Sequence, residues 1–386
     1  MSESPAHIPL CEPHLAGNEW KYIKDCLDTN WVSSVGSYVE RFERMVAEYV
    51  GCRHAVATVN GTAALHVALL VAGVEADDEV LVSDLTFIAP VNAIRYVGAW
   101  PVLIDAEPDY WQMDPAKVED FLARECILEK DGLRNSTTGR RVKAVLPVHI
   151  LGHPCDMDPL LGLADRYGLV VIEDASESLG ALYKGRRVGS LGDVACFSFN
   201  GNKLITTGGG GMLVTDNTEW ASRARYLTTQ AKDDPVEFVH GEVGYNYRLT
   251  NIQAAMGVAQ MEAVDDYLAA KKRIAAAYRE GFAGVGGVEL MREAEWAQSS
   301  WWLSTVLIDA QEYGRDSRSL LELLAEKGIQ TRPLWQPMHL SPTHEGMQKC
   351  GGEVARHLHK TALSLPSSVG LAVRQQERVI SLLRRG

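Results

Sequence analysis

The chain has 386 residues, of which 46% are hydrophobic and 23% are charged, a composition that fits a folded globular protein and excludes a disordered one. Its 38 Lys and Arg against 50 Asp and Glu give a net charge of -12, which repels nucleic acid, so no nucleic-acid partner is expected. The sequence shows no secretion signal and no apolar run long enough for a membrane span, so it predicts a cytoplasmic protein with no membrane partner.

Two residue types that often form metal or disulfide sites are also uninformative here. The seven cysteines are scattered and never spaced C-x-x-C, which indicates neither a disulfide framework nor a zinc ribbon. His149, His153, Cys155 and Asp156 lie close together but lack a recognised ligand spacing, so no metal site is predicted.

In chain order, two amphipathic helices around residues 20–27 and 39–49 come first. Short apolar runs then alternate with helical segments, which predicts βαβ units around a parallel sheet covered on both faces. The predicted strands are 54–58, 79–83, 101–105, 143–147, 169–173, 195–199 and 211–215, and two crossover helices are predicted at 63–72 and 159–167. The polar segment 131–141 is expected to be a surface loop.

After residue 250 the pattern changes to one long Ala-rich helix over 251–282. A strand at 302–308, a helix at 317–327, a strand at 329–332 and a last helix at 374–384 follow, which predicts a smaller α+β domain. We therefore expect a large domain over residues 1–255 and a small C-terminal domain over residues 256–386.

Three segments carry possible chemistry at strand ends. Lys203 follows a buried strand among glycines, where desolvation can free its amine for Schiff-base chemistry, although a surface lysine is the simpler explanation. Asp174 ends another strand and could pair with a cofactor pyridine nitrogen, or could merely cap a turn. The segment Asn60-Gly-Thr-Ala63 joins a strand to a helix, where it could bind phosphate or act as a plain helix cap.

Together these segments resemble the DegT-type sugar aminotransferases among the fold-type I enzymes that use pyridoxal 5'-phosphate (PLP). The likeness spans almost the whole chain and includes residues 60–65, 86–87, 173–175, 197–203 and 244–255. It implies an α/β fold with a large three-layer domain, a mainly parallel sheet and a smaller C-terminal α+β domain. It also implies PLP as cofactor, glutamate as amino donor and a homodimer with shared active sites.

The resemblance assigns a role to each matching position. Lys203 would hold PLP as a Schiff base and later move a proton, Asp174 would pair with the pyridine nitrogen, and Phe87 would stack on the ring. The phosphate would be held by Thr62, Ala63 and Ser198, and Asn246 would reach the site from the partner subunit. Position 177 is usually Gln or His in the family, and Glu177 beside the cofactor's 3-oxygen would have to be protonated or turn toward substrate.

The finer likeness is to enzymes that aminate C4 of a UDP-linked 4-keto-6-deoxy-N-acetylhexosamine in bacterial surface-glycan or nonulosonic acid biosynthesis. It is carried by residues 8–10, 17–20, 31–36 and 200–203, and the substrate pocket would draw on Trp31, Ser33, Ser34 and His339. A structural role for His339 is equally open. Two alternatives are kept: a GDP-4-keto-6-deoxymannose aminotransferase of the perosamine synthase type, and a non-catalytic regulator that retains the fold.

Overall fold

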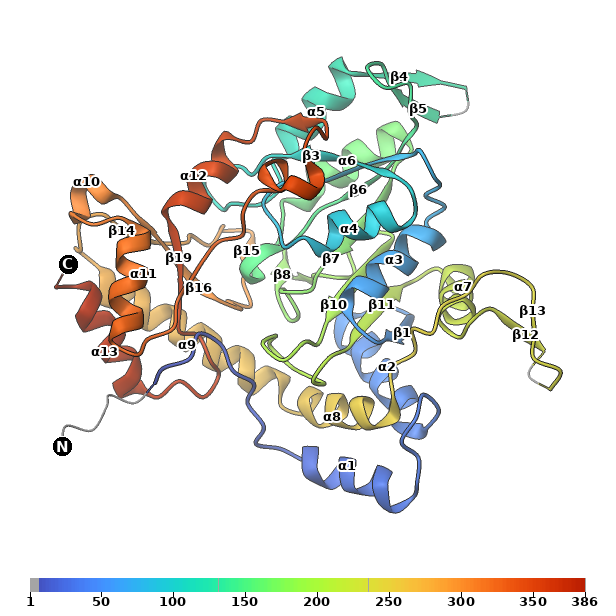
Figure 1. The fold of residues 1–386 in the computed structure, drawn as a ribbon, viewed down its shortest axis with the longest axis horizontal. Coiled ribbons are helices and arrows are strands. Elements are labelled where there is room, and N and C mark those ends of the chain that lie inside the picture. The colour runs from blue at the N-terminus through green and yellow to red at the C-terminus, as the bar shows by residue number, and fades with distance from the viewer. Residues whose placement is uncertain (1–6, 131, 235, 386) are drawn as a thin grey trace.

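The computed structural model describes residues 7–130, 132–234 and 236–385, and an eight-stranded sheet lies at its centre (Figure 1). The strands are ordered β1 (His54–Thr58), β11 (Gly211–Thr215), β10 (Val194–Ser198), β7 (Val170–Asp174), β6 (Val142–Leu146), β2 (Glu79–Ser83), β3 (Trp100–Ile104) and β18 (Lys349–Cys350). Every pair from β10 to β18 is parallel, and β11 is antiparallel to both of its neighbours. The seven predicted strands are thus confirmed as members of one mainly parallel sheet.

Consecutive residues of a strand point to opposite sides of the sheet, and here both sides are apolar. Helices therefore cover both faces. On β1, Val56 belongs to one apolar core, whereas Ala55 and Ala57 belong to the other. The first core contains residues of α3 (Gly61–Val71), α4 (Ala89–Tyr96) and α7 (Thr218–Thr228), and the second contains residues of α2 (Ser37–Val50), α5 (Pro115–Arg124) and α6 (Met157–Tyr167). The large domain therefore has the expected three layers.

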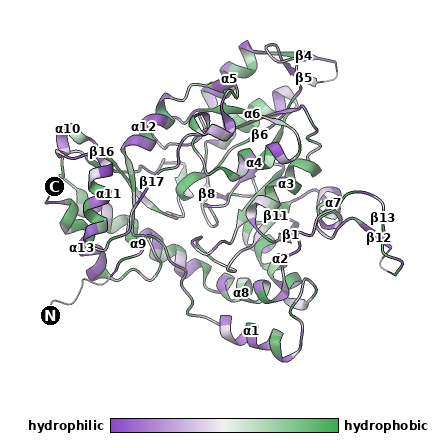
Figure 2. Cartoon of the chain, viewed as in Figure 1, coloured by the Kyte–Doolittle hydropathy of each residue, from purple (hydrophilic) through white to green (hydrophobic). Residues whose placement is uncertain are grey.

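Helix α3 is apolar around almost its whole circumference, as its colours in Figure 2 show. It packs against β10 and β11 on one side and against α4 and α7 on others, so nearly all of its side chains are buried. The N-terminus of this central helix lies directly after β1, which places its first turn at the end of the sheet.

The prediction of one long helix over 251–282 is wrong in one respect, because the segment forms two helices. Helix α8 (Asn251–Met261) ends before Glu262, and α9 (Val264–Phe282) begins after Ala263, whose dihedral angles are not helical. The Glu262 carboxylate accepts hydrogen bonds from Tyr22 of α1 (Glu19–Asp28) and Arg41 of α2. These long-range contacts stabilise a break that local composition does not indicate.

The loop predicted over 131–141 is wrong over residues 132–135, which form a strand; residue 131 lies outside the described residues. Strand β5 (Gly132–Asn135) pairs antiparallel with β4 (Cys126–Glu129) as a hairpin. Asn135 then donates to Glu79, and Thr138 donates to the same carboxylate. The polar residues that suggested a free loop are therefore used to fasten the hairpin to the sheet.

The C-terminal part forms a four-stranded antiparallel sheet, ordered β14 (Val288–Leu290), β16 (Ser304–Ile308), β19 (Ala362–Leu365) and β17 (Arg332–Pro333). It is accompanied by α10 (Ala310–Tyr313), α11 (Ser317–Glu326), α12 (Glu353–Thr361) and α13 (Val373–Leu383), toward which α9 leads in Figure 1. The strand predicted at 329–332 shrinks to β17, because Ile329 makes only an isolated bridge with Ile8. The division at residue 255 stays a prediction.

None of the helices in the described part of the chain is both long and apolar enough to cross a membrane.

Candidate active site

A cavity of about 450 Å³ lies where the parallel strands end, the edge at which α/β sheets bind ligands. Segments that follow β1, β2, β7 and β10 converge there with residues of the C-terminal part. The residues that line it are Asn60, Gly61, Thr62, Leu65, Thr86, Phe87, Ala89, Pro90, Val148, Asp174, Ser176, Glu177, Ser198, Asn200, Asn202, Lys203, Gly209, Gly210, Trp302, Arg332 and Trp335.

The cavity brings together six of the residues that the sequence singled out, namely Thr62, Phe87, Asp174, Glu177, Ser198 and Lys203. They come from four separate segments of the chain, so their meeting is a tertiary result. Ala63 is buried just behind this surface, and its N–H donates to Asn60 Oδ1 over 2.8 Å.

Lys203 follows β10 in a turn closed by a hydrogen bond from its N–H to the carbonyl of Asn200. Its side chain is only 14% exposed, and Nζ lies 3.5 Å from Glu177 Oε1. The other oxygen of Glu177 accepts the N–H of Leu151 over 2.7 Å. Burial raises the pKa of Glu177, although the nearby Lys203 ammonium opposes this shift. The amine and the carboxylate therefore both face the cavity.

Asp174 is the last residue of β7, and its side chain is buried at the cavity. Burial raises the pKa of this carboxyl group, while the Ser176 N–H, which donates to Oδ1 over 3.0 Å, and the Lys203 charge act in the opposite direction. A buried carboxylate with few donors favours a cationic partner, which a protonated pyridine nitrogen would provide.

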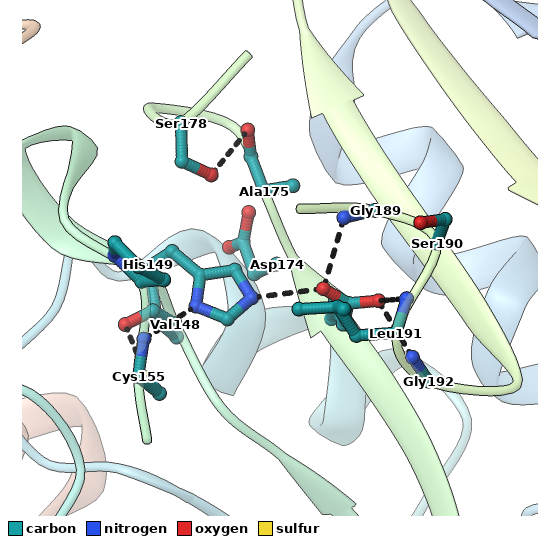
Figure 3. Close-up of polar contacts among 12 residues, drawn as sticks. Val148, His149, Cys155, Asp174, Ala175, Ser178, Gly189, Ser190, Leu191 and Gly192 are labelled. Atoms are coloured by element: carbon teal, nitrogen blue, oxygen red, sulfur yellow. Dashed lines mark hydrogen bonds and ion pairs between the residues drawn. The ribbon is translucent and has the colours of Figure 1, made fainter. Parts of the chain in front are cut away.

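Glu173, one residue earlier on β7, points to the other side of the strand, because side chains alternate along a strand. Figure 3 shows His149, Gly189, Leu191 and Gly192, which bind it. Glu173 accepts the N–H groups of Gly189, Leu191 and Gly192. It also accepts the Nε2 proton of His149, whose Nδ1 in turn accepts the N–H of Cys155 over 2.9 Å. This cluster is buried and fully hydrogen-bonded, so it supports the strand that carries Asp174.

The same contacts account for His149 and Cys155, which had been considered as metal ligands. Within the described ranges, no group of three or more His, Cys, Asp or Glu side chains is arranged to hold a metal ion.

The opposite end of the cavity has the features of a phosphate site. The first amides of α3 lack intrahelical acceptors, and the helix dipole favours an anion at this end. Thr62 and Ser198 add hydroxyl groups. The backbone is packed too closely for side chains, because a Cβ on Gly61 would lie 2.9 Å from Ser198 Cβ and one on Gly211 would lie 2.4 Å from the carbonyl oxygen of Asn60.

These observations fit PLP. The phosphate would be held at the α3 N-terminus, the ring nitrogen by Asp174 and the aldehyde carbon by Lys203, while Phe87, whose side chain is 56% exposed, would cover a ring face. When bound, PLP supplies a pyridine ring that takes up the electrons of a broken C–H bond.

The residues predicted to bind substrate do not line this cavity. His339 is buried against Asp84, with its Nδ1 2.5 Å from Oδ2 and its backbone N–H donating to Oδ1. It thereby fastens the segment that leads to Phe87, which is the structural role that had been left open. The carbonyls of Trp31 and Ser33 accept hydrogen bonds from Asn251 at the start of α8, and Ser34 lies in the same segment.

Asn246 is likewise absent from the lining of the cavity in its own chain. It lies beside Thr229, with which it forms an isolated bridge. Arg248, two residues further along, binds Glu43 of its own chain, with an Nη1 to Oε1 distance of 2.8 Å.

Sequence reasoning missed the side of the cavity that the C-terminal part supplies. Trp302, Arg332 and Trp335 line it, and the two indole rings are parallel with centroids 6.4 Å apart. The sequence carries one signal for this side, the pair Trp301-Trp302 at the start of a predicted strand, and it does not indicate a place in the site.

Comparison with known proteins agrees with this geometry. The model of the DegT/DnrJ/EryC1/StrS aminotransferase family matches residues 13–384. The chain belongs to this family. As members of the DegT/DnrJ/EryC1/StrS family are PLP-dependent sugar aminotransferases of fold type I, the cofactor and the fold class inferred from the residues are confirmed.

Relatives within the family are similar over nearly their whole length. GDP-perosamine synthase from Caulobacter vibrioides is 41% identical over 385 residues, which cover 99% of each chain. GDP-perosamine synthase from Escherichia coli O157:H7 is 38% identical and covers 96% of this chain and 95% of its own. The crystal structure of S. venezuelae DesV is 34% identical and superposes with a TM-score of 0.85 over 95% of this chain and 94% of that one.

Proposed function

We propose that the chain transfers an amino group from glutamate to C4 of GDP-4-keto-6-deoxymannose, with 2-oxoglutarate and the GDP-linked 4-amino sugar as products. The observation that carries this proposal is the 41% identity to the Caulobacter vibrioides GDP-perosamine synthase over 99% of both chains. A GDP-linked substrate therefore replaces the UDP-linked one favoured by the sequence. Of the segments that suggested the UDP sugar, residues 200–203 contribute to the lining of the cavity, whereas residues 31–36 do not.

Several residues of the cavity have a task in this reaction. Asp174 holds a proton at the ring nitrogen of the cofactor, which requires its carboxylate to be ionised. Lys203 takes a proton from the substrate carbon and delivers it to the cofactor carbon through Nζ. Thr62, Ser198 and the α3 N-terminus bind the phosphate, so the cofactor keeps one orientation while the amine moves.

The active enzyme is proposed to be a homodimer in which Asn246 completes the site of the partner subunit. Large apolar side chains exposed on the described chain support an interface: Trp20 is 76%, Trp31 55% and Val35 68% exposed. Surfaces of this kind on a folded domain mark interaction sites.

The substrate can be tested by running the two half-reactions separately. Glutamate should convert the bound cofactor to its pyridoxamine form, seen as loss of the visible absorbance band. GDP-4-keto-6-deoxymannose should then restore the band, and the UDP-linked 4-keto-6-deoxy-N-acetyl sugar should not. The Lys203→Ala variant is the control and should respond to neither step.

The other outcomes are equally informative. Recovery with the UDP sugar alone would return the assignment to the UDP-linked substrate. A response to glutamate without recovery by either sugar would overturn the substrate and leave the cofactor assignment intact. Absence of any change with glutamate would favour the non-catalytic regulator.

A further inference from the structure

The amine of Lys203 lies against an aromatic ring that the reaction above does not use. Nζ is 4.1 Å from the centroid of the Trp302 indole. A cation within about 6 Å of a tryptophan face is attracted by the negative potential of the ring. The Glu177 carboxylate, 3.5 Å away, provides the second contact of the amine.

The position of this indole is set by contacts on several sides. Its Nε1–H donates over 2.7 Å to the carbonyl of Asn202, the residue next to Lys203. The carbonyl of Trp302 accepts a hydrogen bond over 2.8 Å from the buried ammonium group of Lys271, which lies on α9. Trp302 itself is only 2% exposed. The ring cannot turn away from Lys203 without breaking the hydrogen bond of its Nε1–H, and the Lys271 contact fixes the backbone from which the ring extends.

A fixed indole at this place matters because, under the proposed function on which this inference rests, the amine is free for part of each cycle. A free ammonium in a largely buried cavity pairs with a carboxylate within reach. Asp174 lines the same cavity, and pairing with it would compete with the ring nitrogen of the cofactor. The neutral indole attracts the cation without adding a charge to the cavity.

We propose that Trp302 is a catalytic residue whose indole face receives the Lys203 ammonium whenever the amine is not bonded to the cofactor, and keeps it beside Glu177 and away from Asp174. Lys271 is a positioning residue that acts through the carbonyl of Trp302.

The uptake of PLP by the apoenzyme tests this proposal, because only the unprotonated amine attacks the PLP aldehyde. The rate of uptake is followed by absorbance as a function of pH. The Trp302→Leu variant lacks the ring that stabilises the protonated form of Lys203. Its curve of uptake rate against pH should therefore move toward lower pH by about half a unit to one unit. Trp302→Phe should move it less, in the same direction. Glu177 and Asp174, the carboxylates that face the amine, are the same in every variant.

If Trp302 has a purely structural role, its variants should take up PLP more slowly, but the pH dependence of the uptake rate should be that of the wild type. The matched control is Trp335→Leu, since Trp335 stacks on Trp302 but, in the described part of the chain, makes no cation–π contact with Lys203; its curve should stay in place. If Trp302→Leu does not fold, Trp302→Phe, which preserves a planar ring, provides the test of the proposal. A folded Trp302→Phe apoenzyme whose curve coincides with that of the wild type overturns the proposal.

Failure of the proposed function would look different. If borohydride reduction still attached PLP covalently to the Lys203→Ala variant, the role of Lys203 itself would be wrong. If that variant stays unlabelled while the Trp302 variants show the wild-type curve, only the role of Trp302 is wrong.

Discussion

At the scale of single residues, the two neighbouring carboxylates on β7 have opposite environments. Glu173 is buried, yet the pKa of its carboxyl group is lowered by hydrogen bonds from His149 and from the Gly189 and Gly192 amides, which outweigh the effect of burial. Burial instead raises the pKa of Asp174. An acid with a raised pKa stabilises the fold below its unfolded-state pKa, and this contribution is lost as pH rises through the folded-state pKa. Ionisation of Asp174 therefore lowers the stability of the apoenzyme as pH rises.

Asp174→Asn should make the apoenzyme more stable at pH 7 by about 1 kcal/mol, because it removes a buried charge while Oδ1 can still accept the Ser176 N–H. It should also reduce the stabilisation that PLP provides, since an amide cannot pair with a protonated pyridine. Thermal unfolding with and without PLP measures both effects. Glu173→Gln is the matched control and should lower the stability of the apoenzyme by about 3 kcal/mol, because it replaces a fully hydrogen-bonded carboxylate. A less stable Asp174→Asn apoenzyme would contradict this account.

At the scale of elements, the strands of the main sheet are evident in the sequence because each is a nearly continuous apolar run. The break at Glu262 and the hairpin of β4 and β5 are not, because both depend on partners far away in the chain, such as Tyr22 for Glu262 and Glu79 for Asn135. The phosphate end of the cavity can be predicted only in part from the sequence. Its glycine-containing segment is visible in the sequence, but the close approach of Gly211 to Asn60 is seen only in the fold.

Gly211→Ala should weaken PLP binding at least about tenfold, because the new Cβ would lie 2.4 Å from the Asn60 carbonyl oxygen and displace the start of α3. A PLP titration of the apoenzyme measures the Kd. The control is Gly162→Ala in α6, where nothing lies within 4 Å of the new Cβ. That variant should bind PLP as the wild type does and gain about 0.5–1 kcal/mol in stability from its higher helix propensity. Equal PLP affinity in both variants would show that the α3 N-terminus tolerates displacement.

At the scale of the whole molecule, the proposed dimer predicts complementation between two inactive variants. If Asn246 serves the site of the partner subunit, a mixed dimer of Lys203→Ala and Asn246→Ala chains contains one site with both changes and one with neither. Unfolding and refolding the two variants together should then restore about one quarter of the wild-type activity. If Asn246 serves its own chain, every site carries one change and no activity returns. Each variant refolded alone is the control, and light scattering gives the mass of the assembly.

The sequence by itself determined the strands of the sheet and the candidate residues at strand ends, because apolar runs and the residues that follow them are local patterns. Lys203, Asp174 and Thr62 were singled out in this way, and the resemblance to the DegT-type aminotransferases then implied the cofactor and their roles. Only the tertiary structure decided what surrounds them: Trp302 beneath the Lys203 amine, Arg332 and Trp335 on the C-terminal side of the cavity, and Asp84 against His339. These contacts join residues from distant parts of the chain, so their geometry follows from the tertiary fold, for which the local sequence carries no signal.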